Sequence, residues 1–255
     1  MKVSELKVVV TGAAGGLGQH FCLSLCREGA SVAAVDLNAD GLASLARDAE
    51  GLPGKLRTYS ADVTRPEDTG EAVRRAQAEL GPLNGLVNNA GIARDGRLLK
   101  VDERREEVLR MPREQWQKVL DVNLTGPFYM AREVAAAMVE SKTRPGIIIN
   151  ISSISRHGIV GQANYSAAKA GVAVSSRVWA QELAPFGIRV VAIAPGFVRT
   201  GLIGVMSQEA LEDVVSRVPM ARLGEPEEIY AGLRFAIECD YFNGRCLDID
   251  GGLGV

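Results

Sequence analysis

The chain has 255 residues, 47% of them hydrophobic and 24% charged, which is enough to bury a core in one large or two small α/β domains. A formal net charge of -2 and an isoelectric point of about 5.8 argue against a nucleic-acid or anionic-membrane surface, which needs a concentrated excess of Lys and Arg. The chain lacks the roughly 18 consecutive apolar residues of a membrane span and a signal-peptide pattern, so we expect a cytoplasmic protein with a small-molecule partner.

Short apolar runs predict the strands of the fold. In chain order they are "LKVVVTG" from Leu6, "SVAAVD" from Ser31, "LRTYSAD" from Leu56, "LNGLVNNAG" from Leu83, "GIIINISS" from Gly146, "IRVVAIAPG" from Ile188 and "RCLDIDGG" from Arg245. Several are continuous Val, Ile and Leu stretches, typical of strands covered on both faces, and amphipathic helical segments lie between them. The pattern predicts an α/β fold with a single doubly wound Rossmann-type domain over 1–255, in which helices flank a parallel seven-stranded sheet.

A glycine-rich turn, "TGAAGGLG", follows the first predicted strand and leads into the first helix. Gly12, Gly16 and Gly18 allow a tight turn, close approach of the backbone to a pyrophosphate, and close packing of helix on sheet. The helix N-terminus then offers free N–H groups to the phosphates. The turn therefore predicts a dinucleotide site.

Asp36 ends the second predicted strand, where a carboxylate can accept hydrogen bonds from adenosine ribose hydroxyls and repel a 2′-phosphate. Neither the glycine turn nor the following "LNAD" offers a basic residue to attract that phosphate. NAD(H) is therefore favoured over NADP(H). The alternative for Asp36 is a helix N-cap or a turn residue.

A charged insertion near 97–112 interrupts the alternation of strands and helices. The stretch "RLLKVDERREEVLRMPREQW" is too long for a tight connection and is rich in both signs of charge. It is either a solvated excursion or hairpin, or a rim that contributes to substrate choice or subunit contact. Elsewhere, Cys22, Cys26, Cys239 and Cys246 lack zinc-site spacing, so we expect reduced structural cysteines and no metal site.

The stretch "NYSAAKAG" places Tyr165 four residues before Lys169. Alanines favour a helix, in which residues i and i+4 lie on one face about one turn apart. Such a pair occurs on many solvated helix faces, so a chemical role depends on the rest of the chain.

With the glycine turn and the Tyr/Lys pair on one chain, the sequence resembles the short-chain dehydrogenase/reductase family. From about Lys7 to Gly252 the family's motifs follow in order: "TGAAGGLG", "ADV", "NNAG", "DVNLTG", "INISS", "YSAAK" and "PGFVRT". The subgroup it is most similar to includes the 3-oxoacyl-acyl-carrier-protein reductases and secondary-alcohol dehydrogenases. The resemblance implies an NAD(P)(H)-dependent oxidoreductase that moves a hydride between the nicotinamide and a ketone or secondary alcohol, with 3-oxoacyl thioesters among the candidate substrates.

The resemblance also implies catalytic roles for Asn123, Ser153, Tyr165 and Lys169. Tyr165 would be the general acid for carbonyl reduction, because a nearby ammonium and a cationic nicotinamide lower a phenol pKa that is ordinarily near 10. Lys169 would also hold the nicotinamide ribose, and Asn123 would hold a relay water. Ser153 would stabilise the substrate oxygen. It lies one residue closer to Tyr165 than the family's usual spacing, which Ser152 keeps, so Ser152 is the alternative.

Further cofactor contacts carry over by motif: Gly12, Gly16, Leu17, Gly18, Asp36, Asp62, Val63, Asn89, Ala90, Gly91, Pro195, Gly196, Val198 and Thr200, besides Tyr165 and Lys169. A segment near 201–217 resembles the family's substrate lid, with an ordinary surface helix as the alternative. The family resemblance suggests a homotetramer. The apolar stretch "AGVAVSSRVWA" after Lys169 fits burial either between subunits or within one chain.

Three questions about function stay open at this point. A catalytically inactive nucleotide-binding regulator, and a lyase or epimerase on the same scaffold, are alternatives to the oxidoreductase. A carrier-bound thioester would need a basic docking surface, which Arg94, Arg97, Arg104 and Arg105 could supply. The substrate itself is not identified by the sequence.

Overall fold

A seven-stranded parallel sheet forms the centre of the computed structural model, which describes residues 1–102, 107–200 and 208–253. The strand order is β3-β2-β1-β4-β7-β8-β9, and each neighbouring pair is parallel. The strands are β1 (Lys7–Thr11), β2 (Ser31–Asp36), β3 (Lys55–Ser60), β4 (Gly85–Asn88), β7 (Gly146–Ile151), β8 (Ile188–Pro195) and β9 (Cys246–Ile249). The predicted α/β fold and its parallel sheet are confirmed.

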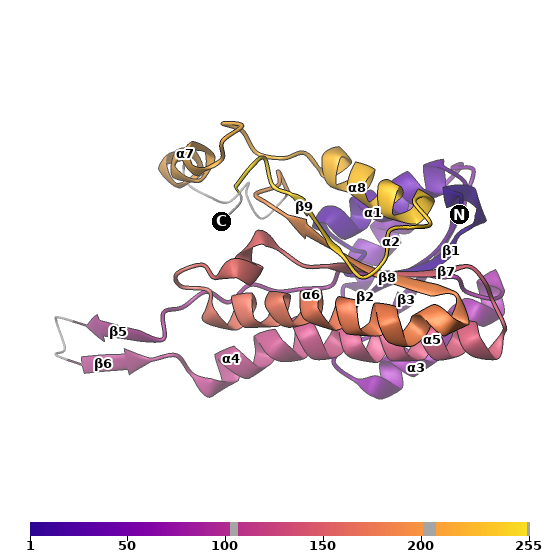
Figure 1. The fold of residues 1–255 in the computed structure, drawn as a ribbon, viewed down its shortest axis with the longest axis horizontal. Coiled ribbons are helices and arrows are strands. Elements are labelled where there is room, and N and C mark those ends of the chain that lie inside the picture. The colour runs from indigo at the N-terminus through magenta and orange to yellow at the C-terminus, as the bar shows by residue number, and fades with distance from the viewer. Residues whose placement is uncertain (103–106, 201–207, 254–255) are drawn as a thin grey trace.

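Helices cover both faces of the sheet (Figure 1). One face carries α1 (Gly16–Arg27), α2 (Ala39–Asp48) and α8 (Pro226–Glu238), and the other carries α3 (Pro66–Leu80), α5 (Gly126–Glu140) and α6 (Ala163–Leu183). The remaining described helices are α4 (Arg113–Leu120) and α7 (Gln208–Arg217), with short helical turns η1 (Val3–Glu5), η2 (Asp121–Thr125), η3 (Ile154–His157) and η4 (Ala184–Phe186). Strand order reverses between β1 and β4, where doubly wound sheets bind ligands.

The apolar run of β1 shows why the strands read as continuous hydrophobic stretches. Val8 and Val10 are buried in the core under α1, α2 and α8, whereas Val9 is buried in the core on the other face. Successive side chains of a strand point to opposite faces, so a strand covered on both sides needs apolar residues at every position.

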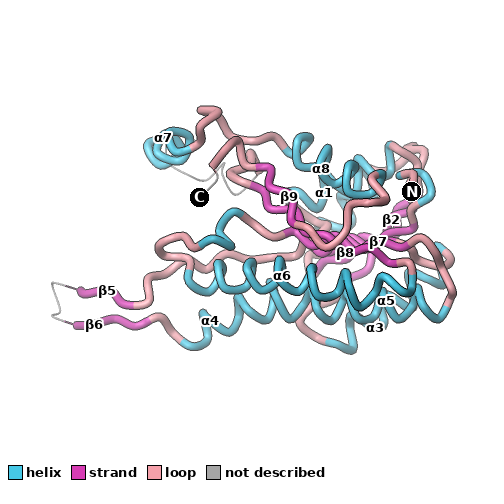
Figure 2. The backbone as a smooth tube through the Cα atoms, viewed as in Figure 1, coloured by secondary structure: helices cyan, strands magenta, loops and turns pink. Residues whose placement is uncertain are grey.

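The insertion near 97–112 contains a two-stranded antiparallel hairpin, β5 (Leu99–Asp102) and β6 (Glu107–Arg110). It projects away from the body of the molecule beyond α4 (Figure 2). At its base, the Gly96 N–H donates to the Gly161 oxygen at 2.7 Å, close to the start of α6. Arg104 and Arg105, considered for carrier docking, lie outside the described residues.

The segment predicted as a lid, near 201–217, is described only from residue 208 onward, where it forms α7. Helix α7 lies at the same end of the molecule as the hairpin (Figure 1). Within the described ranges, none of the helices combines the length and apolar character needed to cross a bilayer.

Candidate active site

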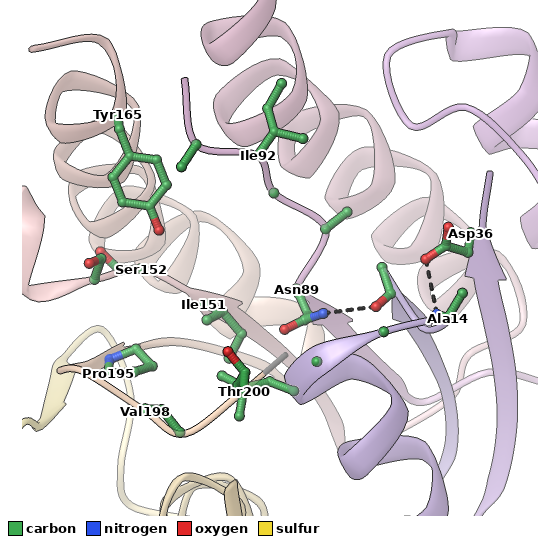
Figure 3. Close-up of a pocket in the computed structure, with 18 of the residues that line it drawn as sticks. Ala14, Asp36, Asn89, Ile92, Ile151, Ser152, Tyr165, Pro195, Val198 and Thr200 are labelled. Carbon is green, nitrogen blue, oxygen red and sulfur yellow. Dashed lines mark hydrogen bonds between the residues drawn. The ribbon is translucent and has the colours of Figure 1, made fainter. Parts of the chain in front are cut away.

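A cavity of about 640 Å³ opens at the carboxyl ends of β1, β4, β7 and β8. Most of the predicted site residues line it: Gly12, Gly16, Leu17, Asp36, Asn89, Ala90, Gly91, Ser153, Tyr165, Pro195, Gly196, Val198 and Thr200. Figure 3 shows the Tyr165 ring reaching from α6 toward the end of β7, with Asp36 at the far side. Gly18, Asp62, Val63, Asn123 and Lys169 do not line this cavity.

The glycine turn is held tightly against the end of β4. Gly12 has φ +64°, and a Cβ there would lie 2.8 Å from the Ala90 Cα. A Cβ at Gly18 would overlap the Gly12 oxygen, so Gly18 serves helix packing behind the cavity wall. Asn89 Nδ2 donates to the Gly12 oxygen at 3.2 Å (Figure 3). Helix α1 begins at Gly16, which leaves its first N–H groups beside the cavity.

Asp36 lies at the end of β2 on the cavity wall. Its Oδ2 accepts from the Ala14 N–H at 3.0 Å and its Oδ1 accepts from the Asn38 N–H at 2.9 Å (Figure 3 shows the first bond). Asn38, not Asp36, is the N-cap of α2, since its Oδ1 accepts from the Gly41 N–H. The carboxylate therefore organises the turn and presents negative charge at the same time.

Asp62 and Val63 do not line the cavity. Asp62 Oδ1 accepts from the Thr64 N–H at 2.8 Å and from the Thr64 hydroxyl at 2.7 Å. Burial would raise the pKa of Asp62, but these bonds outweigh it and hold that pKa below its ordinary value. Val63 packs under Gly126, where an added Cβ would lie 2.9 Å from its Cγ2. Their assignment to the adenine stays a prediction.

Tyr165 and Lys169 lie one turn apart on α6, as the alanine-rich sequence predicts. The Lys169 Nζ lies 5.6 Å from the centre of the Tyr165 ring. Burial raises the pKa of Tyr165, a hydrogen bond with Ser153 lowers it, and the charge of Asp95 raises it, with a net upward shift. The expected lowering by Lys169 is thus absent from the protein by itself, because burial dominates.

Lys169 is buried, and its Nζ donates to the Ile151 oxygen at 2.7 Å. Desolvation of the ammonium lowers the pKa of Lys169 to about 8. The lysine therefore titrates close to neutral pH, behind the cavity wall and next to the end of β7.

The two candidate serines have different surroundings. The Ser152 hydroxyl is buried and donates to the Lys169 backbone oxygen at 2.8 Å. The Ser153 hydroxyl lowers the pKa of Tyr165, lines the same cavity, and accepts from the Ser155 N–H at 3.1 Å, as the N-cap of η3. The Ser153 hydroxyl is therefore the one beside the phenol, whereas the Ser152 hydroxyl forms a structural hydrogen bond that joins β7 to α6.

Asn123 is fully buried in a π-helical turn, η2, between α4 and α5. Its Oδ1 accepts from the Ile92 N–H and its Nδ2 donates to the Ile92 oxygen, both at 2.8 Å. A Cβ on Gly91 would lie 3.3 Å from Asn123 Oδ1 and 3.5 Å from Lys169 Nζ, so these three residues meet. The side chain thus fixes the backbone after β4, and π-helical turns are frequent at functional sites.

Several residues of the cavity wall were not predicted from the sequence: Ala14, Gly15, Asn38, Ile92, Ala93, Ile151 and Phe197. Most lie inside or next to the quoted motifs, so the motif boundaries could have indicated them. Among the described residues, no group of three or more His, Cys, Asp and Glu is arranged to hold a metal ion.

Comparison with known proteins matches residues 6–210 to the family model for short chain dehydrogenases. The 3-oxoacyl-(acyl-carrier-protein) reductase of Thermotoga maritima is 40% identical over 258 aligned positions, covering all of both chains. The acetoacetyl-CoA reductase of Allochromatium vinosum is 36% identical and covers 96% of this chain and 97% of its own. A crystal structure of a short-chain type dehydrogenase/reductase from Mycobacterium marinum superposes with a TM-score of 0.87 at 31% identity, covering 99% of this chain and 96% of that one.

Proposed function

The chain belongs to the short-chain dehydrogenase family and is a nicotinamide-dependent oxidoreductase acting on C=O and CH–OH groups, and we propose that it reduces the ketone of 3-oxoacyl thioesters with NADH. The thioester substrate is supported by the names of its similar relatives, a 3-oxoacyl-(acyl-carrier-protein) reductase and an acetoacetyl-CoA reductase. The observation that carries the chemistry is that Ser153 and Tyr165 line the cavity together, with the Nζ of buried Lys169 5.6 Å from the centre of the Tyr165 ring. These relatives are reductases and give no support to an inactive regulator, a lyase or an epimerase.

The residues of the cavity fit a dinucleotide. Gly12 keeps the glycine turn close to the end of β4, and α1 begins at the turn with its N–H groups free for a pyrophosphate. When bound, the nicotinamide supplies the hydride. Pro195, Gly196, Val198 and Thr200 line the opposite wall, as expected for residues around the nicotinamide and its carboxamide.

The preference for NADH rests on Asp36. Its carboxylate lines the cavity at the end of β2 and accepts from two backbone N–H groups. The described cavity wall contains no Arg or Lys that could neutralise a 2′-phosphate. Bringing that phosphate next to Asp36 would set two negative charges together, whereas the ribose hydroxyls of NADH can donate to the carboxylate.

Tyr165 donates the proton in ketone reduction. Its raised pKa keeps the phenol protonated at neutral pH, which is the form that a general acid needs. The proton passes from the phenol oxygen to the substrate oxygen as negative charge develops there. Ser153 donates a hydrogen bond to the same substrate oxygen and stabilises that charge. In alcohol oxidation, the cationic nicotinamide would lower the phenol pKa and favour the phenolate.

Lys169 and Asn123 support the proton donor. A lysine with a pKa of about 8 can exchange protons near neutral pH, and its position behind Gly91 suits a role in holding the nicotinamide ribose and reprotonating Tyr165. Both side-chain amide atoms of Asn123 are hydrogen-bonded to the Ile92 backbone, so we assign Asn123 the role of fixing that backbone near Lys169. The water relay assigned to Asn123 stays a prediction.

We further propose a cytoplasmic homotetramer. In the apolar stretch after Lys169, Val172 and Ala180 are buried, whereas Val174 is 65% exposed and Val178 is also exposed. Phe128 on α5 is exposed as well. Large apolar side chains on neighbouring helices favour burial between subunits over burial within one chain.

The test is the oxidation of NADH and of NADPH by the purified protein with acetoacetyl-CoA, in parallel with small and cyclic ketones. We expect turnover of the thioester, and faster turnover with NADH than with NADPH. Turnover of other ketones without any turnover of the thioester would overturn the substrate proposal. Faster turnover with NADPH would overturn the cofactor proposal.

A further inference from the structure

An arginine outside all the predicted site residues ties the turn after Ser153 to the edge of the sheet. Arg156 lies in η3, and its Nη2 approaches both carboxylate oxygens of Asp248 on β9, at 2.7 and 2.8 Å. The Arg156 side chain is only 12% exposed, whereas that of Asp248 is 46% exposed. A largely desolvated guanidinium held by a carboxylate on another element restricts the position of its own turn.

The same arginine holds the backbone of Ser153. The Ser153 oxygen accepts from the Arg156 N–H at 3.1 Å and from Arg156 Nη1 at 3.4 Å. Ser153 is the N-cap of η3, and it lines the cavity together with Tyr165, whose pKa its hydroxyl lowers. A shift of η3 would therefore move the Ser153 hydroxyl relative to the phenol.

Asp248 belongs to the element that positions the opposite wall of the cavity. In β9 it is in register with Ala194 of β8, directly before Pro195. The Gly196 N–H donates to the Ile249 oxygen at 2.9 Å, and a Cβ on Gly196 would lie 2.7 Å from the Asp250 Cα. The end of β9 therefore fixes the start of the segment 195–200. The Arg156 to Asp248 pair connects the Ser153 side of the cavity to the Pro195 side.

We propose that Arg156 is a positioning residue for ketone reduction, which with Asp248 fixes the Ser153 hydroxyl against Tyr165 and against the wall at Pro195. This inference rests on the proposed roles of Ser153 and Tyr165. Arg156 touches neither the substrate nor the cofactor in this role, so its loss lowers kcat and leaves the binding of NADH unchanged. Misplacement of a reacting group by about 1 Å can cost on the order of a hundredfold in rate.

The first experiment replaces Arg156 with Met, which keeps most of the apolar stem and removes the charge. The matched control is Arg222→Met, which breaks the exposed Arg222 to Glu228 pair, 2.6 Å long, whose two residues do not line the cavity. With acetoacetyl-CoA and NADH, we expect kcat to fall on the order of tenfold or more in Arg156→Met. NADH affinity, measured by its fluorescence, should match wild type, and the control should retain wild-type kcat.

A pH profile separates positioning from a general loss of structure. Tyr165 is faced by Ser153 from the end of β7, by Lys169 from its own helix and by Asp95 from the loop after β4. A displaced Ser153 hydroxyl would no longer lower the pKa of Tyr165, so in Arg156→Met the pH at which alcohol oxidation reaches half its maximal rate should shift upward. The variant Arg156→Lys keeps the positive charge and should retain part of the kcat that Arg156→Met loses. The double variant Arg156→Asp with Asp248→Arg, which exchanges the two charges, should have a higher kcat than Arg156→Asp alone.

Three results would overturn the inference. They are an unchanged kcat and pH profile in folded Arg156→Met, an equal loss in Arg222→Met, and no recovery in either the lysine variant or the charge swap. If Arg156→Met does not fold, Arg156→Lys carries the test through its pH profile. Absence of ketone turnover in the wild-type protein would instead contradict the proposed function. That outcome differs from failure of the Arg156 inference, in which the wild-type protein is active and Arg156→Met is equally active.

Discussion

The Lys169 Nζ donates to the Ile151 backbone oxygen at 2.7 Å, and the Ser152 hydroxyl donates back to the Lys169 backbone oxygen at 2.8 Å. These two bonds join α6 to the end of β7 at the point where the cavity begins. They also keep Lys169 buried, so desolvation of its ammonium dominates its titration.

The burial of Lys169 predicts a pH-dependent stability. Its pKa is about 8 in the folded protein and 10.5 when unperturbed, so between these values the unfolded chain binds more protons than the folded one. The free energy of unfolding therefore rises with pH across this window, by an amount on the order of 3 kcal/mol for this group. Below pH 8 the full penalty of protonating a buried lysine is present.

The measurement is urea unfolding of wild type and Lys169→Met at several pH values from 7 to 10.5. Other groups titrate in the same window, so the difference between the two proteins is the relevant quantity. Relative to the variant, wild type should gain stability as the pH rises. A constant difference, or one that moves in the opposite direction, would show that the pKa of Lys169 is not lowered in the folded protein.

Removal of the Tyr165 phenol group should strongly reduce ketone reduction without weakening the binding of NADH. Tyr165→Phe keeps the ring against Lys169 and removes the proton donor, so kcat for acetoacetyl-CoA reduction should fall on the order of a thousandfold. NADH fluorescence should still report binding. Tyr241→Phe, at a fully exposed tyrosine, is the control and should retain wild-type kcat. A Tyr165→Phe enzyme with kcat within a few-fold of wild type would exclude Tyr165 as the general acid.

Features that depend on local sequence were predictable. The Val8 to Val10 run gave a strand covered on both faces, and the alanines around Tyr165 and Lys169 gave a helix that sets the pair one turn apart. The glycine turn indicated the phosphate end of the cavity, because only a backbone without Cβ allows Gly12 to approach Ala90. In each case the residues that carry the signal lie within a few positions of one another along the chain.

Features that depend on remote contacts were not predictable. The pairing of Arg156 with Asp248 joins residues 92 positions apart, and no spacing rule connects them. The π-helical turn at Asp121–Thr125 reflects how Asn123 meets Ile92, which a helical pattern does not reveal. The lowered pKa of Lys169 required its burial to be known. Sequence spacing reports neighbours along an element, whereas these features arise from packing between elements.

Replacement of Asp36 should change the preference of the enzyme for NADH over NADPH. Asp36→Ser removes the negative charge that opposes a 2′-phosphate, and Leu37→Arg adds a cation at an exposed neighbouring position. The double variant should shift the ratio of kcat/KM for NADPH to that for NADH by on the order of a hundredfold toward NADPH, which corresponds to about 3 kcal/mol. Steady-state kinetics with both cofactors measure this ratio. The control Asp40→Ser, in the first turn of α2, should leave it unchanged. An unaltered ratio in the double variant would remove Asp36 as the determinant.

Replacing Ser152 or Ser153 with alanine should lower kcat to different extents. Ser153→Ala removes the hydroxyl beside Tyr165, so kcat for ketone reduction should fall by on the order of a hundredfold or more. It also removes the N-cap bond to the Ser155 N–H, which should lower the free energy of unfolding by about 1 kcal/mol. Ser152→Ala removes the buried bond to the Lys169 oxygen and should lower the free energy of unfolding by about 1 kcal/mol, with a smaller effect on kcat. Kinetics and urea unfolding on both variants give the comparison. If Ser152→Ala lost more kcat than Ser153→Ala, the serine roles would be reversed, and the Ser153 hydroxyl would serve only as the N-cap of η3.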